Sequence, residues 1–358
     1  MPVYINPDFD RLASRHAAVF SKSSRDSFFA LPVWYDLMAL YGVPPATEVR
    51  VYTDVRPASV LVPLARTTAQ DRGRILASLT NAHSLEHGIL HVPGANLEMG
   101  LEVILSEILA ERPQWDCLTL AELDPRDPSY ASLLGAMRRV GMLVECHFSS
   151  GTWYEETAGL GFAEYLAARP SELRNTWRRK HRKLAKGRRL TKSFFEDDNG
   201  IDQAVAEYET VYAASWKPAE FLPGFVPALI RLAGRLRALR LGIYYLDGTP
   251  VAAQFWIVWN GRAVICKLAH DKRLEDLSLG TVLTMEMFER VLATDRPREI
   301  SFGRGDDPYK KLWLSTRRER WGITAANPRT LRGLQLGFTR QAAMLYHRLR
   351  GDRISPLD

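Results

Sequence analysis

The chain has 358 residues, 46% of them hydrophobic, and a formal net charge of +7. This length predicts two domains, and the apolar content suffices for packed cores, which excludes disordered, collagen-like and coiled-coil classes. The charge is unevenly distributed: residues 169–192 carry a net charge of +10 and residues 316–358 of +6, which leaves −9 on the remainder. The sequence therefore predicts an acidic body with one basic segment and one basic tail.

The N-terminal half alternates between helical and extended patterns. Two alternating, β-branched runs within residues 49–66 flank a polar turn at residues 54–57, which predicts a hairpin. The other expected elements are helices at 7–18, 31–41, 97–111 and 128–140, and strands at 74–80, 116–120 and 142–148.

The C-terminal half begins with two helical patterns that contain most of the basic segment. Three strands follow within residues 241–271, where Asp247-Gly248 and Asn260-Gly261 are strong hairpin-turn signals. The other expected elements are helices at 161–168, 170–186, 202–216, 226–239, 281–293, 308–314 and 329–349, and strands at 191–195, 299–302 and 320–324.

Two parts of the chain resemble each other in the order of their elements. The hairpin at 49–66 parallels the one at 242–259, about 190 residues later. The helix at 97–111 with its following strand parallels the helix at 281–293 with the strand at 299–302, about 182 residues later. Two tandem copies of one α+β fold account for this pattern; chance similarity between ordinary hairpins is the alternative.

The cysteines and the apolar runs indicate the cellular compartment of the protein. Cys117, Cys146 and Cys266 lie far apart and form no CxxC spacing, so we expect buried thiols in a reducing compartment and no metal site. The N-terminus lacks the pattern of a signal peptide, and the longest apolar run, 251–259, is too short to span a membrane. A soluble cytoplasmic protein is expected.

A polar loop between a strand and a helix is a candidate phosphate site. The N-terminus of a helix offers free N–H groups and partial positive charge to an anion. The candidate donors and close-approach residues are Lys272, Arg273, Ser278, Gly280 and Thr281. The alternative is that Ser278 is an ordinary N-cap.

A second cluster follows the strand expected at 299–302. Small residues around Arg304 allow a substrate close to the backbone, and Tyr309 and Lys310 can donate to a carbonyl or phosphate. Asp306 is either catalytic or a helix cap before Pro308.

At these residues the sequence resembles the CelD-like acetyltransferase family of the GNAT (acyl-CoA N-acyltransferase) superfamily, which is related to the Fem aminoacyltransferases. The resemblance covers about residues 165–325, including the basic helical segment and Ser215-Trp216-Lys217. It is carried by Asp271, Ser278, Gly280, Gly303, Gly305, Asp306, Pro308, Tyr309, Lys310 and Trp313.

The resemblance implies an α+β fold with two tandem GNAT-like domains, of which the N-terminal copy is degenerate. The expected domains are residues 1–155, residues 156–328 with the acyltransferase activity, and a basic C-terminal helix and tail at 329–358. In register with Gly280, the chain has Glu275 and Ser278 where the superfamily's pyrophosphate signature has Gln or Arg and Gly. Because an acidic side chain binds phosphate poorly, acyl donors other than acetyl-CoA stay candidates.

Acyl transfer to an amine needs a neutral amine, a polarised carbonyl and a proton acceptor. The resemblance implies direct attack by the amine, and the chain has no GxSxG or catalytic-cysteine signature. The candidates for proton removal are Asp271, His270 and Asp306. Lys310 orients or polarises the donor or the acceptor.

The basic segment allows three interpretations: a solvated helix face, a site for an anionic acceptor such as a diphosphate-linked sugar lipid, or a nucleic-acid contact such as a charged tRNA. No heptad arm like the tRNA-binding arm of Fem proteins is present, which disfavours tRNA. The expected substrate-binding residues are Trp177, Arg178, Arg182, Trp216, Lys217, Arg304 and Tyr309.

The expected function is transfer of an acyl group, acetyl above all, from acyl-CoA to an amine of an amino sugar or another precursor of a cell-surface polysaccharide. The substrate would be a small molecule or a lipid-linked sugar, with peripheral contact to the inner face of the cell membrane. One alternative is a Fem-like aminoacyltransferase that uses aminoacyl-tRNA on a cell-wall precursor. The other is a non-enzymatic protein that binds anions or nucleic acid through residues 169–192. The oligomeric state is not predicted.

Overall fold

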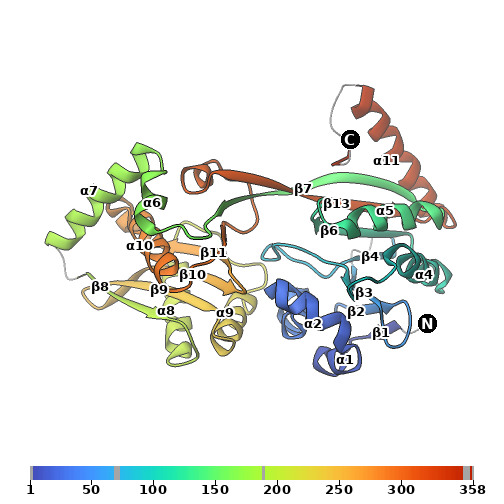
Figure 1. Ribbon diagram of the computed structural model, residues 1–358, viewed down its shortest axis with the longest axis horizontal. Helices are drawn as coiled ribbons and strands as arrows, with labels where there is room; N and C mark the ends of the chain where they lie inside the picture. The colour runs from blue at the N-terminus through green and yellow to red at the C-terminus, as the bar shows by residue number, and fades with distance from the viewer. Residues whose placement is uncertain (1–2, 68–72, 188–189, 350–354, 357–358) are drawn as a thin grey trace. The chain divides into compact units, whose positions relative to one another are not determined.

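The computed structural model describes residues 3–67, 73–187, 190–349 and 355–356 (Figure 1). The chain forms two compact units: unit 1 comprises Met1–Gly151 and Glu319–Asp358, and unit 2 comprises Thr152–Arg318. Two long strands, β7 (Leu143–Glu156) and β13 (Thr316–Ala326), contribute residues to both units.

Unit 1 contains a mixed sheet in which the strand order is β1-β2-β3-β4-β6-β13-β7. Its hairpin pairs β2 with β3 in antiparallel fashion, whereas β4 and β6 are parallel because α4 connects them. Its elements in chain order are β1 (Val3–Ile5), α1 (Phe9–Arg15), α2 (Ala17–Asp26), η1 (Phe28–Ala30), α3 (Pro32–Leu37), the π-helical turn η2 (Met38–Gly42), β2 (Val49–Thr53), β3 (Val60–Thr67), β4 (Ile75–Ser78), β5 (Leu90–His91), α4 (Leu97–Ala110), β6 (Cys117–Leu123), α5 (Pro128–Arg139), β7, β13 and α11 (Leu331–Leu349).

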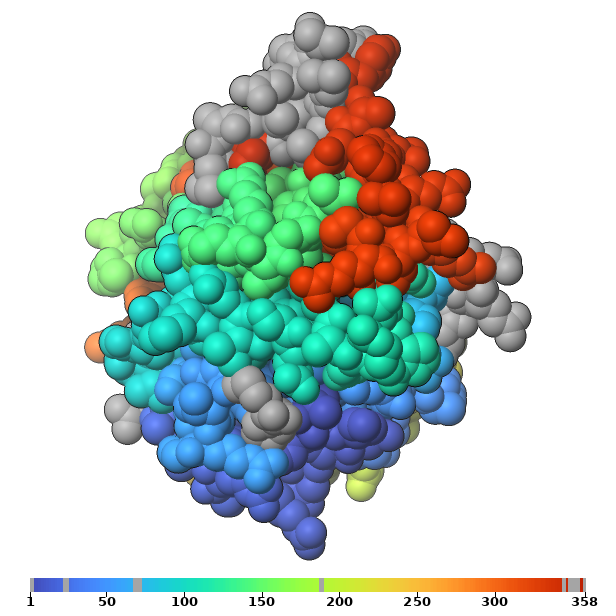
Figure 2. Space-filling model, turned by 90° about the vertical axis from the view of Figure 1, so that its right-hand side faces the viewer, coloured from blue at the N-terminus to red at the C-terminus, as the bar shows by residue number. Residues whose placement is uncertain are grey.

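The C-terminal helix α11 packs onto β7 within unit 1. A Cβ added to Gly337 would stand 2.3 Å from Cδ1 of Leu143, so only a glycine allows this approach. Figure 2 shows the helix in red lying beside the green of β7. The expected basic tail is described only in part, because residues 350–354 and 357–358 lie outside the described residues.

In unit 2 the order of the hydrogen-bonded strands is β7-β12-β11-β10-β9-β8, and only the β11–β12 pair among these is parallel. Its further elements are α6 (Phe162–Ala167), α7 (Ser171–Gly187), β8 (Leu190–Phe195), α8 (Ile201–Ala213), α9 (Phe225–Arg235), β9 (Leu239–Leu246), β10 (Thr249–Trp259), β11 (Arg262–His270), η3 (Lys272–Leu277), α10 (Leu279–Thr294), β12 (Glu299–Ser301) and η4 (Pro308–Leu312).

Helices cover both faces of the sheet in unit 2 (Figure 1). On one face the Phe255 ring of β10 meets Tyr208 of α8, with 5.7 Å between ring centroids. On the other face Trp256 meets Phe288 of α10 at 4.9 Å, and Phe288 stacks on Tyr165 at 4.4 Å. Successive side chains of a strand point to opposite faces, so β10 is buried on both.

Both units contain the same parallel connection, as the internal similarity of the sequence predicts. In unit 1, α4 connects β4 to β6, with Ile75 opposite Cys117; in unit 2, α10 connects β11 to β12, with Arg262 opposite Glu299. The N-termini of the two helices differ. The side chain of Asn96 accepts from Met99 N and caps α4, whereas Ser278 makes no side-chain cap on α10.

The expected boundary at residue 328 lies beyond β13, whereas the contacts assign residues from Glu319 onward to unit 1. The reason is that this part of β13 pairs with β6, for example Ile323 with Leu120. Among the residues that the structure describes, no helix combines the length and apolarity that a membrane span requires.

Candidate active site

A wedge opens in unit 2 where two parallel strands separate. The pairing between β11 and β12 ends at Val264 and Ser301. Strand β11 continues to His270, whereas the segment that follows β12 turns away at Gly303. Gly303 has φ +59°, and a Cβ added there would stand 3.2 Å from Ile265 O. A positive φ of this kind favours glycine. The turn at Gly303, just after β12, therefore opens the wedge.

Helix α10 begins at the base of this wedge. Its N-cap residue Ser278 is left-handed, with φ 53° and ψ 40°, and its side chain does not cap the helix. A Cβ on Gly280 would stand 3.2 Å from both Leu268 Cδ2 and His270 Cδ2, so a glycine is needed for α10 to approach β11 this closely. The hydroxyl of Thr284 donates to Gly280 O at 2.7 Å. The first turn can thus present its N–H groups and partial positive charge to an anion.

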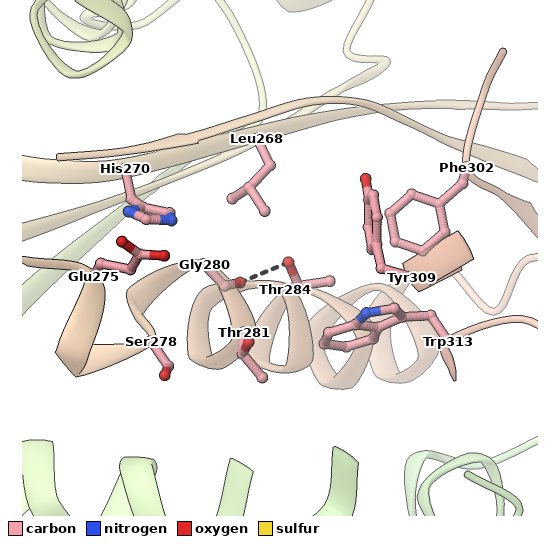
Figure 3. Close-up of a pocket in the computed structure, with 10 residues that line it drawn as sticks. All are labelled: Leu268, His270, Glu275, Ser278, Gly280, Thr281, Thr284, Phe302, Tyr309 and Trp313. Carbon is pink, nitrogen blue, oxygen red and sulfur yellow. Dashed lines mark hydrogen bonds between the residues drawn. The ribbon is translucent and has the colours of Figure 1, made fainter. Parts of the chain in front are cut away.

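A pocket of about 230 Å³ occupies the wedge (Figure 3). In Figure 3, Leu268 and His270 point from the strand toward α10. Three aromatic side chains close the opposite end of the pocket. The lining residues are Leu268, His270, Glu275, Ser278, Gly280, Thr281, Thr284, Phe302, Tyr309 and Trp313. The pocket therefore has a helix N-terminus at one end and an apolar, aromatic surface at the other.

His270 is the titratable group that the pocket exposes on β11. Its Nδ1 lies 3.3 Å from Asp271 O, and its ring lies against Trp216, with 4.6 Å between centroids. Figure 3 shows the carboxylate of Glu275 beneath the imidazole. A base whose ring is held by a backbone carbonyl and an aromatic neighbour is oriented toward the pocket.

The two predicted aspartates are paired with arginines. Asp271 begins η3, and its Oδ1 accepts from Arg273 N at 2.9 Å and Arg273 Nε at 3.0 Å. The bond from Arg273, more than any other cause, holds the pKa of Asp271 below its usual value. Asp306 accepts from Arg317 Nε at 2.8 Å and from Trp153 Nε1 at 2.9 Å, and Arg317 lowers its pKa. Such carboxylates are weak bases, and neither lines the pocket.

Lys310 holds the loop that follows β12 in place through hydrogen bonds and an ion pair. Its side chain is buried, with 4% exposure, and Nζ donates to Arg304 O at 2.9 Å and Gly305 O at 3.0 Å. The third partner is Asp307 Oδ2 at 3.1 Å. Burial lowers the pKa of Lys310 despite these contacts. An ammonium has three donors, and all three are used here, so Lys310 shapes the wedge rather than pointing a free donor into it.

Two further predicted residues lie near the wedge. Tyr309 lines the pocket, packs edge-on against Phe302 at 5.8 Å, and has its pKa raised to about 12 by burial. Lys217 is half-buried and holds its ammonium 5.6 Å from the Trp216 ring centroid. Burial first, and then the neighbouring Lys267, lowers the pKa of Lys217 to about 8.

The basic helix α7 has one packed and one open side. Trp177 packs edge-on against Phe162 at 5.9 Å and lies against the core of unit 2, and its predicted substrate-binding role stays a prediction. Arg178 and Arg182 are exposed. Lys180 donates to the carbonyl of Asp276 in η3, which places α7 beside the start of α10.

The structure thus brings His270, Ser278, Gly280, Thr281 and Tyr309 together around one pocket. It places Lys272, Arg273, Asp271, Asp306, Arg178, Arg182 and Arg304 outside its lining, and their predicted roles stay predictions. Sequence reasoning missed Leu268, Thr284 and Phe302 as lining residues. Strand alternation was an available signal for Leu268, which lies two residues before His270 on the same face.

Comparison with known proteins agrees with this geometry. The profile of the acetyltransferase (GNAT) domain family matches residues 171–311. FemX shares 10% identity over 90% of this chain and 97% of its own, with a TM-score of 0.57. L-PGS from Bacillus licheniformis shares 11% over 93% and 96%, with a TM-score of 0.54. The C-terminal domain of a protein assigned as a lysylphosphatidylglycerol synthetase, from Agrobacterium fabrum, shares 12% over 92% and 95%, with a TM-score of 0.56. No curated protein matches the chain significantly by sequence.

Unit 2 therefore contains a GNAT domain, and the two units together share the fold of FemX. Residues 171–311 thus belong to the acetyltransferase (GNAT) domain family, as the resemblance implies.

Proposed function

We propose that unit 2 transfers an acyl group, acetyl above all, from acyl-CoA to a primary amine. The observation that carries this proposal is the polarity of the pocket, which has the start of α10 at one end and Phe302, Tyr309 and Trp313 at the other. A helix N-terminus binds phosphates, and apolar walls accept a pantetheine arm and an acyl chain. One donor with a diphosphate and a thioester matches both ends.

The proposed chemistry is a direct transfer. The neutral amine attacks the thioester carbonyl carbon, so a C–N bond forms, the C–S bond breaks, and the thiolate leaves. His270 accepts the proton from the nitrogen, because it lines the pocket and is not tied to an arginine as Asp271 and Asp306 are. It lies at the α10 end, over Gly280, so the proton reaches it along the pocket from the thioester at the aromatic end. Tyr309, which stays protonated at neutral pH, donates a hydrogen bond to the carbonyl oxygen or to the departing sulfur.

We propose an amino sugar or another precursor of a cell-surface polysaccharide as the acceptor. The CelD-like motif from Asp271 to Trp313 supports this class, and the pocket itself does not select among amines. A lipid-linked acceptor would bring the enzyme to the inner face of the cell membrane. The exposed arginines of α7 would then face anionic groups of that precursor.

Donor binding is tested first by thermal unfolding with CoA, acetyl-CoA and longer acyl-CoAs. A ligand at a hundred times its dissociation constant adds about 2.7 kcal/mol to the free energy of unfolding. Release of free thiol with a panel of amino sugars then tests the transfer. Stabilisation by CoA together with amine-dependent thiol release is the expected result, and neither effect with any acyl-CoA contradicts the proposal.

The second candidate is an aminoacyltransferase that uses aminoacyl-tRNA. The position of α7 favours it, because the bond from Lys180 to Asp276 O holds a basic helix beside the start of α10. Glu275 at the pocket also repels a diphosphate. Transfer that requires charged tRNA, with a steep dependence on salt and loss in Arg178→Glu and Arg182→Glu, would identify this function. Salt-independent transfer from acyl-CoA in both variants would exclude it.

A further inference from the structure

Lys217, one of the expected substrate-binding residues, has an environment that points to a particular kind of ligand group. It follows α8, and its backbone N–H donates a hydrogen bond to Ser215 Oγ at 3.3 Å. Its side chain is half-buried, and its ammonium lies 5.6 Å from the centroid of the Trp216 ring. The side chain is thus held inside the protein by a positioned backbone and an aromatic face.

The neighbouring charges leave Lys217 without a carboxylate of its own. Lys267 of β11 forms an ion pair with Glu220, and Lys310 forms one with Asp307. Within residues 3–67, 73–187 and 190–349, the ammonium of Lys217 takes part in no ion pair. Three lysines therefore share two carboxylates, and the group carries an excess of one positive charge.

This arrangement is electrostatically unfavourable without an anion. Removing an ammonium from water costs free energy, and nearby like charges add to that cost. The lowered pKa of Lys217 has these causes: burial is the largest, Lys267 follows, and Lys310 also contributes, while Glu220 and Asp307 act in the opposite direction. A bound oxyanion would relieve the repulsion and restore the charged form of the lysine.

Trp216 connects this site to the pocket. The same ring that carries the Lys217 ammonium lies 4.6 Å from the imidazole of His270, which lines the donor pocket. Lys217 is thus separated from the pocket by one aromatic side chain, and an acceptor bound in the pocket can direct a second group toward it. Trp216 is 55% exposed, which leaves its surface open to such a molecule.

We propose that Lys217 binds an oxyanion of the acceptor, so that the enzyme acylates amines carrying a carboxylate or a phosphate in preference to neutral amines. The inference rests on the proposed function, since it assigns the acceptor of that same reaction. Lys267 and Lys310 strengthen the field at this position while their own charges are balanced by Glu220 and Asp307.

The test compares three acceptors that share one amino-sugar scaffold: glucosamine without an anion, glucosamine 6-phosphate with a phosphate, and muramic acid with a carboxylate. We expect kcat/KM to be at least tenfold higher for one of the two anionic acceptors than for glucosamine. In Lys217→Met this ratio falls by tenfold or more, mainly through KM, and in Lys217→Arg it is kept. The control Lys311→Met, at an exposed lysine of η4, keeps the ratio of the wild type.

Equal or lower kcat/KM for both anionic acceptors in the wild type would overturn the proposal, as would a ratio that Lys217→Met leaves intact. A second measurement separates this outcome from failure of the proposed transfer. Acetic anhydride labels neutral lysines, and mass spectrometry at pH 8 reports each site. Inorganic phosphate is expected to slow labelling of Lys217 and not of Lys311. Protection without any transfer supports the anion site and counts against the amino-sugar acceptor; absence of protection counts against the anion site itself.

Discussion

The imidazole of His270 lies over Gly280, the second residue of α10. A Cβ added to Gly280 would stand 3.2 Å from the Cδ2 atom of the ring and 3.2 Å from Cδ2 of Leu268. The proposed base and the proposed phosphate-binding helix end are therefore in direct contact. Any side chain larger than that of glycine at position 280 would therefore press on the proposed base.

Gly280→Ala should reduce catalysis through this contact. The added methyl pushes His270 and Leu268 by a few tenths of an ångström, since 3.2 Å is closer than side-chain carbons normally approach. Displacement of a catalytic group by about 1 Å costs up to about a hundredfold in rate, so we expect a loss on the order of tenfold in kcat/KM. Gly88→Ala is the matched control, because a Cβ there meets nothing within 4 Å. Equal kcat/KM in the two variants would contradict the contact's importance.

His270→Gln should abolish proton removal while it leaves the donor site intact. General-base catalysis contributes about 10²- to 10⁴-fold, and we expect kcat to fall in that range at neutral pH. The thermal stabilisation by CoA should persist, because Ser278, Gly280 and Thr281 remain. His91→Gln in unit 1, whose ring bonds to Val92 O, serves as the control. A variant that keeps wild-type kcat would show that another group accepts the proton.

The order of elements was predictable because local patterns determine it. The Asp247-Gly248 and Asn260-Gly261 turns gave the β9–β10–β11 meander, and the apolar spacing at 281–293 gave α10 within two residues at its N-terminus. The short strands β1 and β5 escaped prediction because three and two residues carry too little pattern. The polar loop expected between β11 and α10 contains the 3₁₀ helix η3, whose N-cap residue Asp271 accepts from Arg273 N.

For the site, the sequence predicted which segments lie close together but not which side chains pair. Sequence order placed His270 and Gly280 on either side of one loop, and in the structure both line one pocket. Spacing carries no information on which carboxylate meets which arginine. The pairing of Asp306 with Arg317 joins residues on either side of η4, and only the folded chain shows it. Lys310 was likewise expected to face the substrate, whereas its donors hold the Arg304–Gly305 backbone.

Lys310→Met should destabilise unit 2 and reduce transfer together. Methionine fills the buried space but leaves the carbonyls of Arg304 and Gly305 without their donor. An unsatisfied buried polar group costs about 1–3 kcal/mol, and we expect a loss of that size in the free energy of unfolding by urea. Lys311→Met, at an exposed position, should stay within about 0.5 kcal/mol of the wild type. Full stability with lost transfer would instead mean that Lys310 acts on the substrate.

The preference for anionic acceptors should depend on pH through Lys217. Its pKa of about 8 lies below that of an ordinary lysine, so the free enzyme carries the charge below pH 8 and loses it above. The charged groups around it are Lys267 on β11, Glu220 after α8, Asp307 just before η4, and Lys310 on η4. The ratio of kcat/KM for muramic acid to that for glucosamine cancels titration of His270 and largely that of the acceptor amine. It should be constant below pH 7 and fall toward tenfold per pH unit above pH 8. In Lys217→Arg the ratio should stay flat to pH 10, because a guanidinium keeps its proton; a wild-type ratio that is also flat would place the anion elsewhere.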